Sequence, residues 1–342
     1  MKEVPTIKRH FNKAFLILIV LAGSLGIGLY TYSFKEASLV ALPLADLPRQ
    51  WRPKDPIKSL SSMPEKVKKG YYLIAETYQY MGPTAEDPND RFTGNNLACT
   101  NCHLKAGTQA GASSWVGIIK RFPQFGGRAN KIGTIEDRIN GCIERSMNGE
   151  KLPENSDKMN AIVAYMDWIS QGLPEKERNI YKGYQPIRIP DMAVDLDKGK
   201  QVFIKECLVC HGEQGQGRKK PNSTGYLYPP LWGLDSYNNG AGMNRVITAA
   251  EFIKSNMPYL QATWDNPKLT DEEAYHVAGY INSFPRPQKT NTALDYPNKK
   301  LKPVSTPYGP WTDHFTKEQH TYGPFPPIIA YYNKTYGITK TK

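Results

Sequence analysis

The chain has 342 residues, enough for two domains of ordinary size, and 39% of them are hydrophobic, enough to form globular cores. Its formal net charge is +12 at pH 7, with an isoelectric point near 9.2. Nucleic acid is a usual partner of so basic a protein, but here the basic residues are spread along the chain and no Lys/Arg run is interleaved with aromatics. This pattern argues against nucleic-acid binding and favours a small anionic substrate or an acidic partner.

Residues 1–34 have the pattern of a signal peptide or a membrane anchor. Basic residues precede an apolar run over residues 15–32, which is about long enough to span a bilayer although several glycines interrupt it. Small residues after the run are poorly arranged for cleavage, which favours an uncleaved anchor and therefore a membrane association through this helix. In both cases the rest of the chain is exported. Residues 35–60 contain four prolines and are predicted to form a linker.

The five-residue pattern C-x-x-C-H occurs twice, at residues 99–103 and 207–211. It is typical of a covalent c-type haem, in which both cysteines form thioethers and the histidine binds the iron. A zinc site or disulfides are the alternatives, but a four-cysteine zinc site needs no histidine after each pair, and a disulfide framework usually belongs to a much shorter chain. We therefore predict two covalently bound c-type haems, and a periplasmic location, because such haems are attached outside the bacterial cytoplasmic membrane. The predicted attachment and proximal-ligand residues are Cys99, Cys102, His103, Cys207, Cys210 and His211.

The helical periodicity predicts an all-α fold with two class I cytochrome c-like domains in tandem, at residues 61–185 and 186–290. Each is expected to run from a helix through the haem motif and a long loop to a short helix and a terminal helix. The predicted helices cover residues 65–80, 134–147, 156–171, a short stretch ending at 207, 248–255 and 270–284. Two of them begin with cap patterns, Thr134 with Asp137 and Thr270 with Glu273. Residues 291–342 are predicted to be a long irregular tail that packs on the domains through its aromatic residues.

The internal repeat locates candidates for the second axial ligand of each iron. The halves align at residues 69–70 with 198–199 and at residues 164–166 with 279–281. Cys142 lies 23 residues before Tyr165, and Met257 lies 23 residues before Tyr280. We therefore predict Cys142 as the ligand of the first iron and Met257 as that of the second. The thiolate is expected to lower the potential of the first haem, whereas methionine raises that of the second.

Other methionines compete for these two positions. Met147 and Met159 lie close to Cys142 in the sequence, but each continues an apolar stripe that is typical of a helix packed in a core. In the second half, Met243 lies 14 residues before Met257, the position that the repeat aligns with Cys142.

Arg138, Cys142 and Ser146 fall at positions i, i+4 and i+8 of one predicted helix and therefore share a face. A neighbouring guanidinium favours the thiolate form of a cysteine and can hold an oxyanion through charge-assisted hydrogen bonds. Arg128 and Arg145 are close in sequence. The alternative is that these arginines pair with haem propionates or face water.

The stretches 121–125 and 136–149 resemble the dihaem thiosulfate dehydrogenases, as do residues 240–243, 256–258, 318–320 and 323–325. The resemblance implies the interconversion of two thiosulfates and tetrathionate with transfer of two electrons, at a first haem ligated by histidine and cysteine. It also implies a small periplasmic electron carrier as redox partner. It assigns catalytic roles to Cys142, Arg138, Ser146, Arg128 and Gln124. Some members have a lysine directly before the methionine of the second haem; here Asn256 takes that position, so lysine ligation is excluded.

Two other functions compete with this one. An electron-transfer cytochrome without a substrate of its own is the first alternative, but it has no need of the Arg138, Cys142 and Ser146 face. A dihaem peroxidase would need a peroxide-handling acid or base beside an open iron site, and His276 is expected to pack within the terminal helix instead.

Overall fold

The computed structural model describes residues 51–342. The predicted leader and most of the predicted linker therefore lie outside the described residues. Within the described range, no helix combines the length and the apolar character that crossing a membrane requires. Short 3-10 turns link the longer elements, at Leu60–Ser62, Pro88–Asp90, Cys99–Asn101, Ile119–Arg121, Glu175–Tyr181, Gly242–Asn244, Thr292–Leu294 and Lys299–Leu301.

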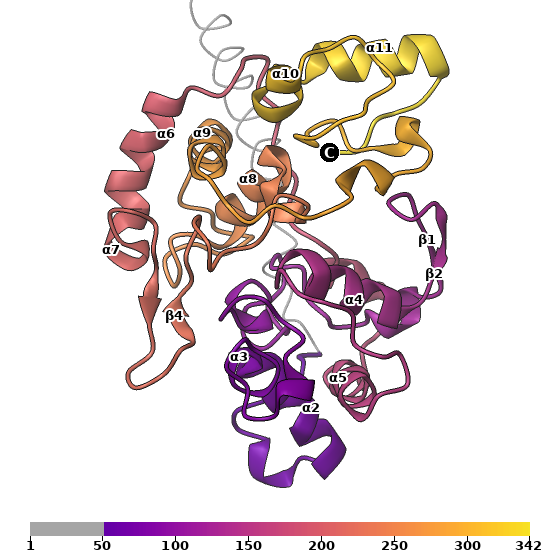
Figure 1. Cartoon of the computed structure of the whole chain (residues 1–342), viewed down its shortest axis with the longest axis vertical. Helices are drawn as coiled ribbons and strands as arrows, with labels where there is room; N and C mark the ends of the chain where they lie inside the picture. The colour runs from indigo at the N-terminus through magenta and orange to yellow at the C-terminus, as the bar shows by residue number, and fades with distance from the viewer. Residues whose placement is uncertain (1–50) are drawn as a thin grey trace, which may run out of the picture. The chain divides into compact units, whose positions relative to one another are not determined.

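The first half is built on helices α2 (Glu65–Ala75), α3 (Thr77–Tyr80), α4 (Ile135–Arg145) and α5 (Asp157–Trp168) (Figure 1). The single helix expected over residues 65–80 is divided at Glu76, whose φ of −131° is not helical. The expected cap of α4 is confirmed, because the Thr134 side chain accepts from the Asp137 backbone N–H and Asp137 accepts from that of Thr134. Helices α2 and α5 pack against each other over the first core, as in a cytochrome c domain.

The second half repeats this arrangement around a second core. Helix α6 (Leu196–Val202) continues through a π-helical turn (Phe203–Cys207) into α7 (Leu208–His211), which delivers the second haem motif. Helices α8 (Val246–Asn256) and α9 (Asp271–Asn282) complete the domain, and α9 begins with the predicted capping box of Thr270 and Glu273. Two tandem cytochrome c domains are therefore present.

Glycines mark equivalent helix crossings in the two halves. A Cβ on Gly70 would lie 2.1 Å from the carbonyl oxygen of Ala161, and one on Gly199 would lie 2.2 Å from that of His276. Both contacts are with backbone atoms of the terminal helix, so neither neighbour can move aside cheaply. The aligned pairs of the internal repeat therefore occupy equivalent places.

Gly70→Ala is expected to destabilise the protein by about 1–3 kcal/mol, because the added methyl group overpacks the crossing of α2 and α5. Denaturant unfolding of the holoprotein measures this change. Gly126→Ala is the matched control, since its Cβ would meet nothing closer than the Lys131 carbonyl oxygen at 3.8 Å. Equal stability of the two variants would contradict the close crossing.

The prediction of an all-α fold is wrong in detail, because two short antiparallel hairpins are present. Strand β1 (Gln124–Gly126) pairs with β2 (Lys131–Gly133), and β3 (Arg218–Lys219) pairs with β4 (Tyr226–Tyr228). Each strand has at most three residues. Such strands are too short to show the alternating pattern by which strands are predicted.

The prediction of an irregular tail is also wrong in part, because the tail contains α10 (Lys317–Tyr322) and α11 (Pro326–Tyr336). Thr316 caps α10, whereas α11 has proline in its first turn and ends at Gly337 in the left-handed region. These local signals were obscured by the proline and tyrosine content of the segment. Two aromatic residues of the tail, Phe325 and Tyr332, are buried in the second core.

Candidate haem-binding and catalytic site

The first haem motif opens onto a cavity of about 270 Å³ in the first half. Cys99, Cys102 and His103 all line it. His103 Nδ1 lies 2.9 Å from the carbonyl oxygen of Ser113, an arrangement in which Nδ1 donates and Nε2 is left for a metal. The ring of Trp115 packs on that of His103, with centroids 4.6 Å apart, and fixes its plane.

Helix α4 supplies another wall of the same cavity. Arg138, Cys142 and Ser146 all line it, so the predicted shared face is present. Arg138 Nη1 donates to Cys142 Sγ at 3.2 Å, and the Cys142 side chain also interacts with His103. Arg138 is exposed and Cys142 is half-buried, so an anion from solvent meets the guanidinium before it meets the sulfur.

The three cysteines of this cavity differ in their acidity. Before haem attachment, burial raises the pKa of the Cys99 thiol to about 11 and that of the Cys102 thiol to about 12. Burial also acts to raise the pKa of Cys142, but Arg138 and His103 outweigh it and lower that pKa to about 6. Of the three cysteines, Cys142 is therefore the one that most readily forms a thiolate.

The second motif is held in a similar way. His211 is buried, and its Nδ1 lies 2.8 Å from the carbonyl oxygen of Pro229, so its Nε2 is also left for a metal. Burial lowers the pKa of His211, which keeps the imidazole neutral as metal ligation requires. Met257 directly follows α8 and packs against the second core. Its competitor Met243 also packs against the second core, but it lines the first cavity as well.

The donor sets fit two c-type haems, which the chain carries. Each motif presents two cysteine thiols and one histidine whose Nδ1 is already bound to a backbone carbonyl. All five cysteines are free of disulfides, which removes the disulfide alternative. The first cavity is largely lined by apolar side chains, among them Ile74, Leu97, Ile139 and Met166, as a porphyrin requires.

The five residues with predicted catalytic roles are not all in the cavity. Gln124, on β1, lines it together with Arg138, Cys142 and Ser146, whereas Arg128 does not. Arg128 Nη1 instead pairs with Asp295 at 2.5 Å and donates to the Tyr308 hydroxyl at 3.0 Å.

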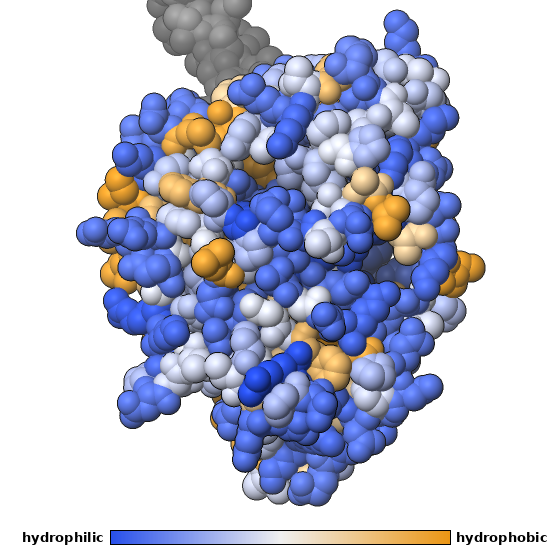
Figure 2. Space-filling view, in the orientation of Figure 1, coloured by the Kyte–Doolittle hydropathy of each residue, from blue (hydrophilic) through white to orange (hydrophobic). Residues whose placement is uncertain are grey.

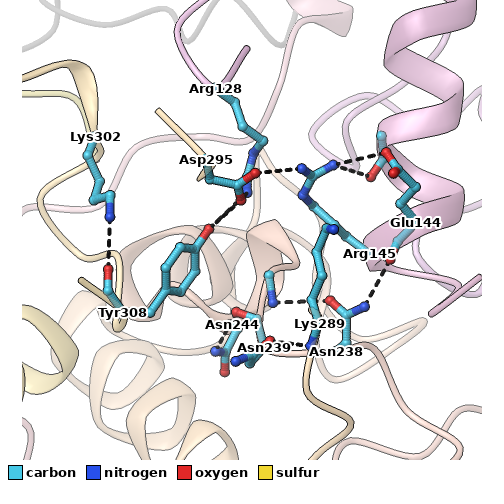
Figure 3. A network of polar contacts seen from close by, with 12 residues as sticks. Arg128, Glu144, Arg145, Asn238, Asn239, Asn244, Lys289, Asp295, Lys302 and Tyr308 are labelled. Carbon is cyan, nitrogen blue, oxygen red and sulfur yellow. Dashed lines mark hydrogen bonds and ion pairs between the residues drawn. The ribbon is translucent and has the colours of Figure 1, made fainter. Parts of the chain in front are cut away.

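Asp295 joins two arginines of the first half to the tail (Figure 3). Its carboxylate accepts from Arg128, from Arg145 Nη2 at 2.8 Å and from the Tyr308 hydroxyl at 2.8 Å. Burial acts to raise the pKa of Asp295, but the two guanidinium groups outweigh it and hold that pKa below its usual range. Arg128 and Arg145 are thus ion-paired with Asp295, whereas Arg138 contacts the Cys142 sulfur in the cavity.

Sequence reasoning missed several residues of the cavity. Arg121 lines it beside Arg138, and its Nε is buried without a hydrogen-bond partner. Lys182, near the end of the first half, adds another cation, and Tyr237 contributes from the second half. Arg121 lies in one of the stretches that carry the family resemblance. The others had no signal in the sequence, because only folding brings them to the first motif.

The comparisons agree with this site. Residues 89–174 match the family model described as SoxA/TsdA, cytochrome c domain, and residues 196–285 match that of cytochrome c. The thiosulfate dehydrogenase of Psychrobacter arcticus is 41% identical over 232 residues, which cover 68% of this chain and 67% of that protein. That of Allochromatium vinosum is 40% identical over 222 residues, covering 63% and 78%.

A solved structure is also similar. The thiosulfate dehydrogenase TsdBA from Marichromatium purpuratum aligns with a TM-score of 0.62 and 32% identity, over 73% of this chain. The match spans about half of that longer chain, 52% of its length. Both halves of the present chain thus match cytochrome c family models, and the chain as a whole has relatives among the thiosulfate dehydrogenases.

Proposed function

Because the chain belongs to the thiosulfate dehydrogenase family, we propose that it interconverts two thiosulfate ions and tetrathionate with the transfer of two electrons. The observation that carries the proposal is the pair of Arg138 and Cys142 facing His103 in the first cavity. An electron-transfer cytochrome without a substrate does not need an exposed guanidinium, that of Arg138, hydrogen-bonded to the Cys142 sulfur. When bound, the two haems take up the two electrons, one each.

Cys142 is the proposed nucleophile and the proposed second ligand of the first iron. Its thiolate forms a bond to the sulfane sulfur of one thiosulfate, and the two electrons released would pass to the haems that His103 and His211 hold. The second thiosulfate then attacks that sulfur and displaces the Cys142 thiolate, so tetrathionate departs and the cysteine is restored. In the reverse direction the same bonds form and break in the opposite order.

The main physical obstacle to the reaction is the electrostatic repulsion between two thiosulfate dianions, and the cations of the cavity reduce it. Arg138 is the proposed principal anion contact, and Ser146 and Gln124 are proposed to donate hydrogen bonds to sulfonate oxygens. Arg128 stays a predicted catalytic residue. Its pairing with Asp295 supports an indirect role, in which it holds the wall of the cavity.

Arg138→Ala is expected to raise the KM for thiosulfate about 10- to 150-fold, because a hydrogen bond to a charged group contributes about 1.5–3 kcal/mol. Arg138→Lys is the matched variant that keeps the charge and should recover part of the loss. Steady-state kinetics with thiosulfate measure both. If Arg138→Ala has the same KM as the unaltered protein, the proposal that α4 provides the anion-binding site is wrong.

We further propose that domain 1 (residues 61–185) is catalytic and that domain 2 (residues 186–290) relays electrons through a His211/Met257-ligated haem to a small periplasmic carrier. Exposed apolar side chains on the helical stretch that delivers the second motif, Ile204 and Val209, support a docking surface there. Figure 2 shows hydrophobic side chains gathered at the edge occupied by α6 and α7. Lys205 lies between them in the sequence and pairs with Glu206 at 3.4 Å.

The direct test of the proposed function uses both anions. Thiosulfate should reduce ferricyanide in the presence of the holoprotein, and tetrathionate should oxidise a reduced dye. If neither anion reacts, the alternative of a pure electron-transfer cytochrome is correct.

A further inference from the structure

Met257 is preceded by a side chain that reaches into the first half of the protein. Asn256 is fully buried, with 0% of its surface exposed. Its Nδ2 donates to the Gly111 carbonyl oxygen at 2.8 Å and to that of Phe252 at 3.0 Å, and its Oδ1 accepts from Gln109 Nε2 at 2.9 Å. Two of these three hydrogen bonds cross between the halves, so the end of α8 is tied to the loop after the first haem motif.

The chain beyond Met257 is anchored in the same loop. Trp264 packs against the hydrophobic core of the first half. Gly111 adopts a φ of +72°, and a Cβ there would lie 2.3 Å from the Cβ of Trp264, so only glycine allows this approach. Met257 is therefore presented by a segment whose two ends both rest on the first half.

The loop that receives Asn256 also holds the first haem motif. The Ser113 carbonyl oxygen contacts His103 Nδ1, and the Trp115 ring packs on the His103 ring. Residues 109–115 thus contact the proximal ligand of one haem and, through Asn256, the candidate distal ligand of the other.

We propose that residues 109–115 of the first half fix Met257 on the second iron, with Asn256 and Gln109 as positioning residues. The inference rests on the ligation of the second haem by Met257 that belongs to the proposed function. A methionine thioether is a neutral, weak ligand, so its binding depends on how firmly the backbone holds it. We call the hydrogen bonds of Asn256 with Gln109 and Gly111 the clamp. Because residues 109–115 also contact His103, a change in the ligation of either haem is expected to alter the ligation of the other, and such coupling is reciprocal.

The test uses the holoprotein with both haems attached and compares four variants. Gln109→Ala and Asn256→Leu break the clamp, and Met257→Ala removes the ligand itself. Asn96→Ala is the matched control, because it removes other hydrogen bonds between the halves, to Asp235, that do not involve the clamp. The readouts are the near-infrared charge-transfer band of methionine-ligated ferric haem, the rate of imidazole binding to the ferric protein, and the reduction potential of each haem.

Gln109→Ala and Asn256→Leu are expected to weaken the band, to accelerate imidazole binding about tenfold as the open fraction rises, and to lower the potential of the second haem. Asn96→Ala should leave all three unchanged. The clamp is overturned if Met257→Ala loses the band while both clamp variants behave like the unaltered protein. If Met257→Ala retains the band, Met257 does not ligate the second haem, and the clamp is wrong with it. This outcome would leave the proposed catalysis at the first haem untouched.

Discussion

Replacing Cys142 by alanine is expected to abolish turnover, with a loss on the order of 10³-fold or more, while both haems stay attached. Cys142 is the one cysteine of the first cavity whose pKa is lowered, to about 6, and it accepts a hydrogen bond from Arg138. Alanine removes both the nucleophile and the iron ligand but leaves Cys99, Cys102 and His103 in place. Haem content and rates with thiosulfate and with tetrathionate measure the two parts of this expectation.

Cys142→Met separates the two roles of the sulfur. Methionine can ligate iron but has no thiolate, so this variant should also be inactive, with a raised potential at the first haem. Undiminished formation of tetrathionate in either variant would rule out the mechanism.

Replacing Asp295 by alanine is expected to cost about 3–5 kcal/mol of folding free energy, because it leaves two half-buried guanidinium groups without their shared carboxylate. The Asp295 side chain is 9% exposed, and those of Arg128 and Arg145 are 24% and 13% exposed. Denaturant unfolding of the holoprotein gives the change.

Two further variants calibrate this measurement. Asp295→Asn keeps the shape and some hydrogen bonds, so it should lose less than Asp295→Ala. Asp265→Ala removes an exposed carboxylate in a turn and should cost under about 0.5 kcal/mol. If Asp295→Ala is as mild as Asp265→Ala, the carboxylate does not hold the tail on the first half.

Local signals explain what could be predicted from the sequence. The cap of Thr134 begins α4 at the expected residue, and the spacing of Arg138, Cys142 and Ser146 puts them in one cavity. The haem motifs are contiguous in the chain, and the register of the repeat singles out Cys142, which the structure brings to His103. Each of these inferences rests on residues that are close in sequence or on a helical period.

The remaining features depend on contacts between distant residues, for which the sequence contains no comparable signal. Asp295 is 167 residues from Arg128, and Asn256 is 147 residues from Gln109. Neither a helical periodicity nor a capping pattern predicts such pairs, since they form only when the two halves and the tail pack together. The place of Arg121 in the cavity, and the pairing of Arg128 with Asp295 outside it, likewise depend on the folded chain.

The most direct test of the proposed chemistry is anaerobic mixing of the fully oxidised holoprotein with excess thiosulfate and no external acceptor. Haem absorbance and tetrathionate are then measured in the same sample. The proposal predicts that both haems become reduced and that one tetrathionate appears for each chain, because the two c-type haems take one electron each. Haems that stay oxidised, or become reduced without formation of tetrathionate, would contradict it.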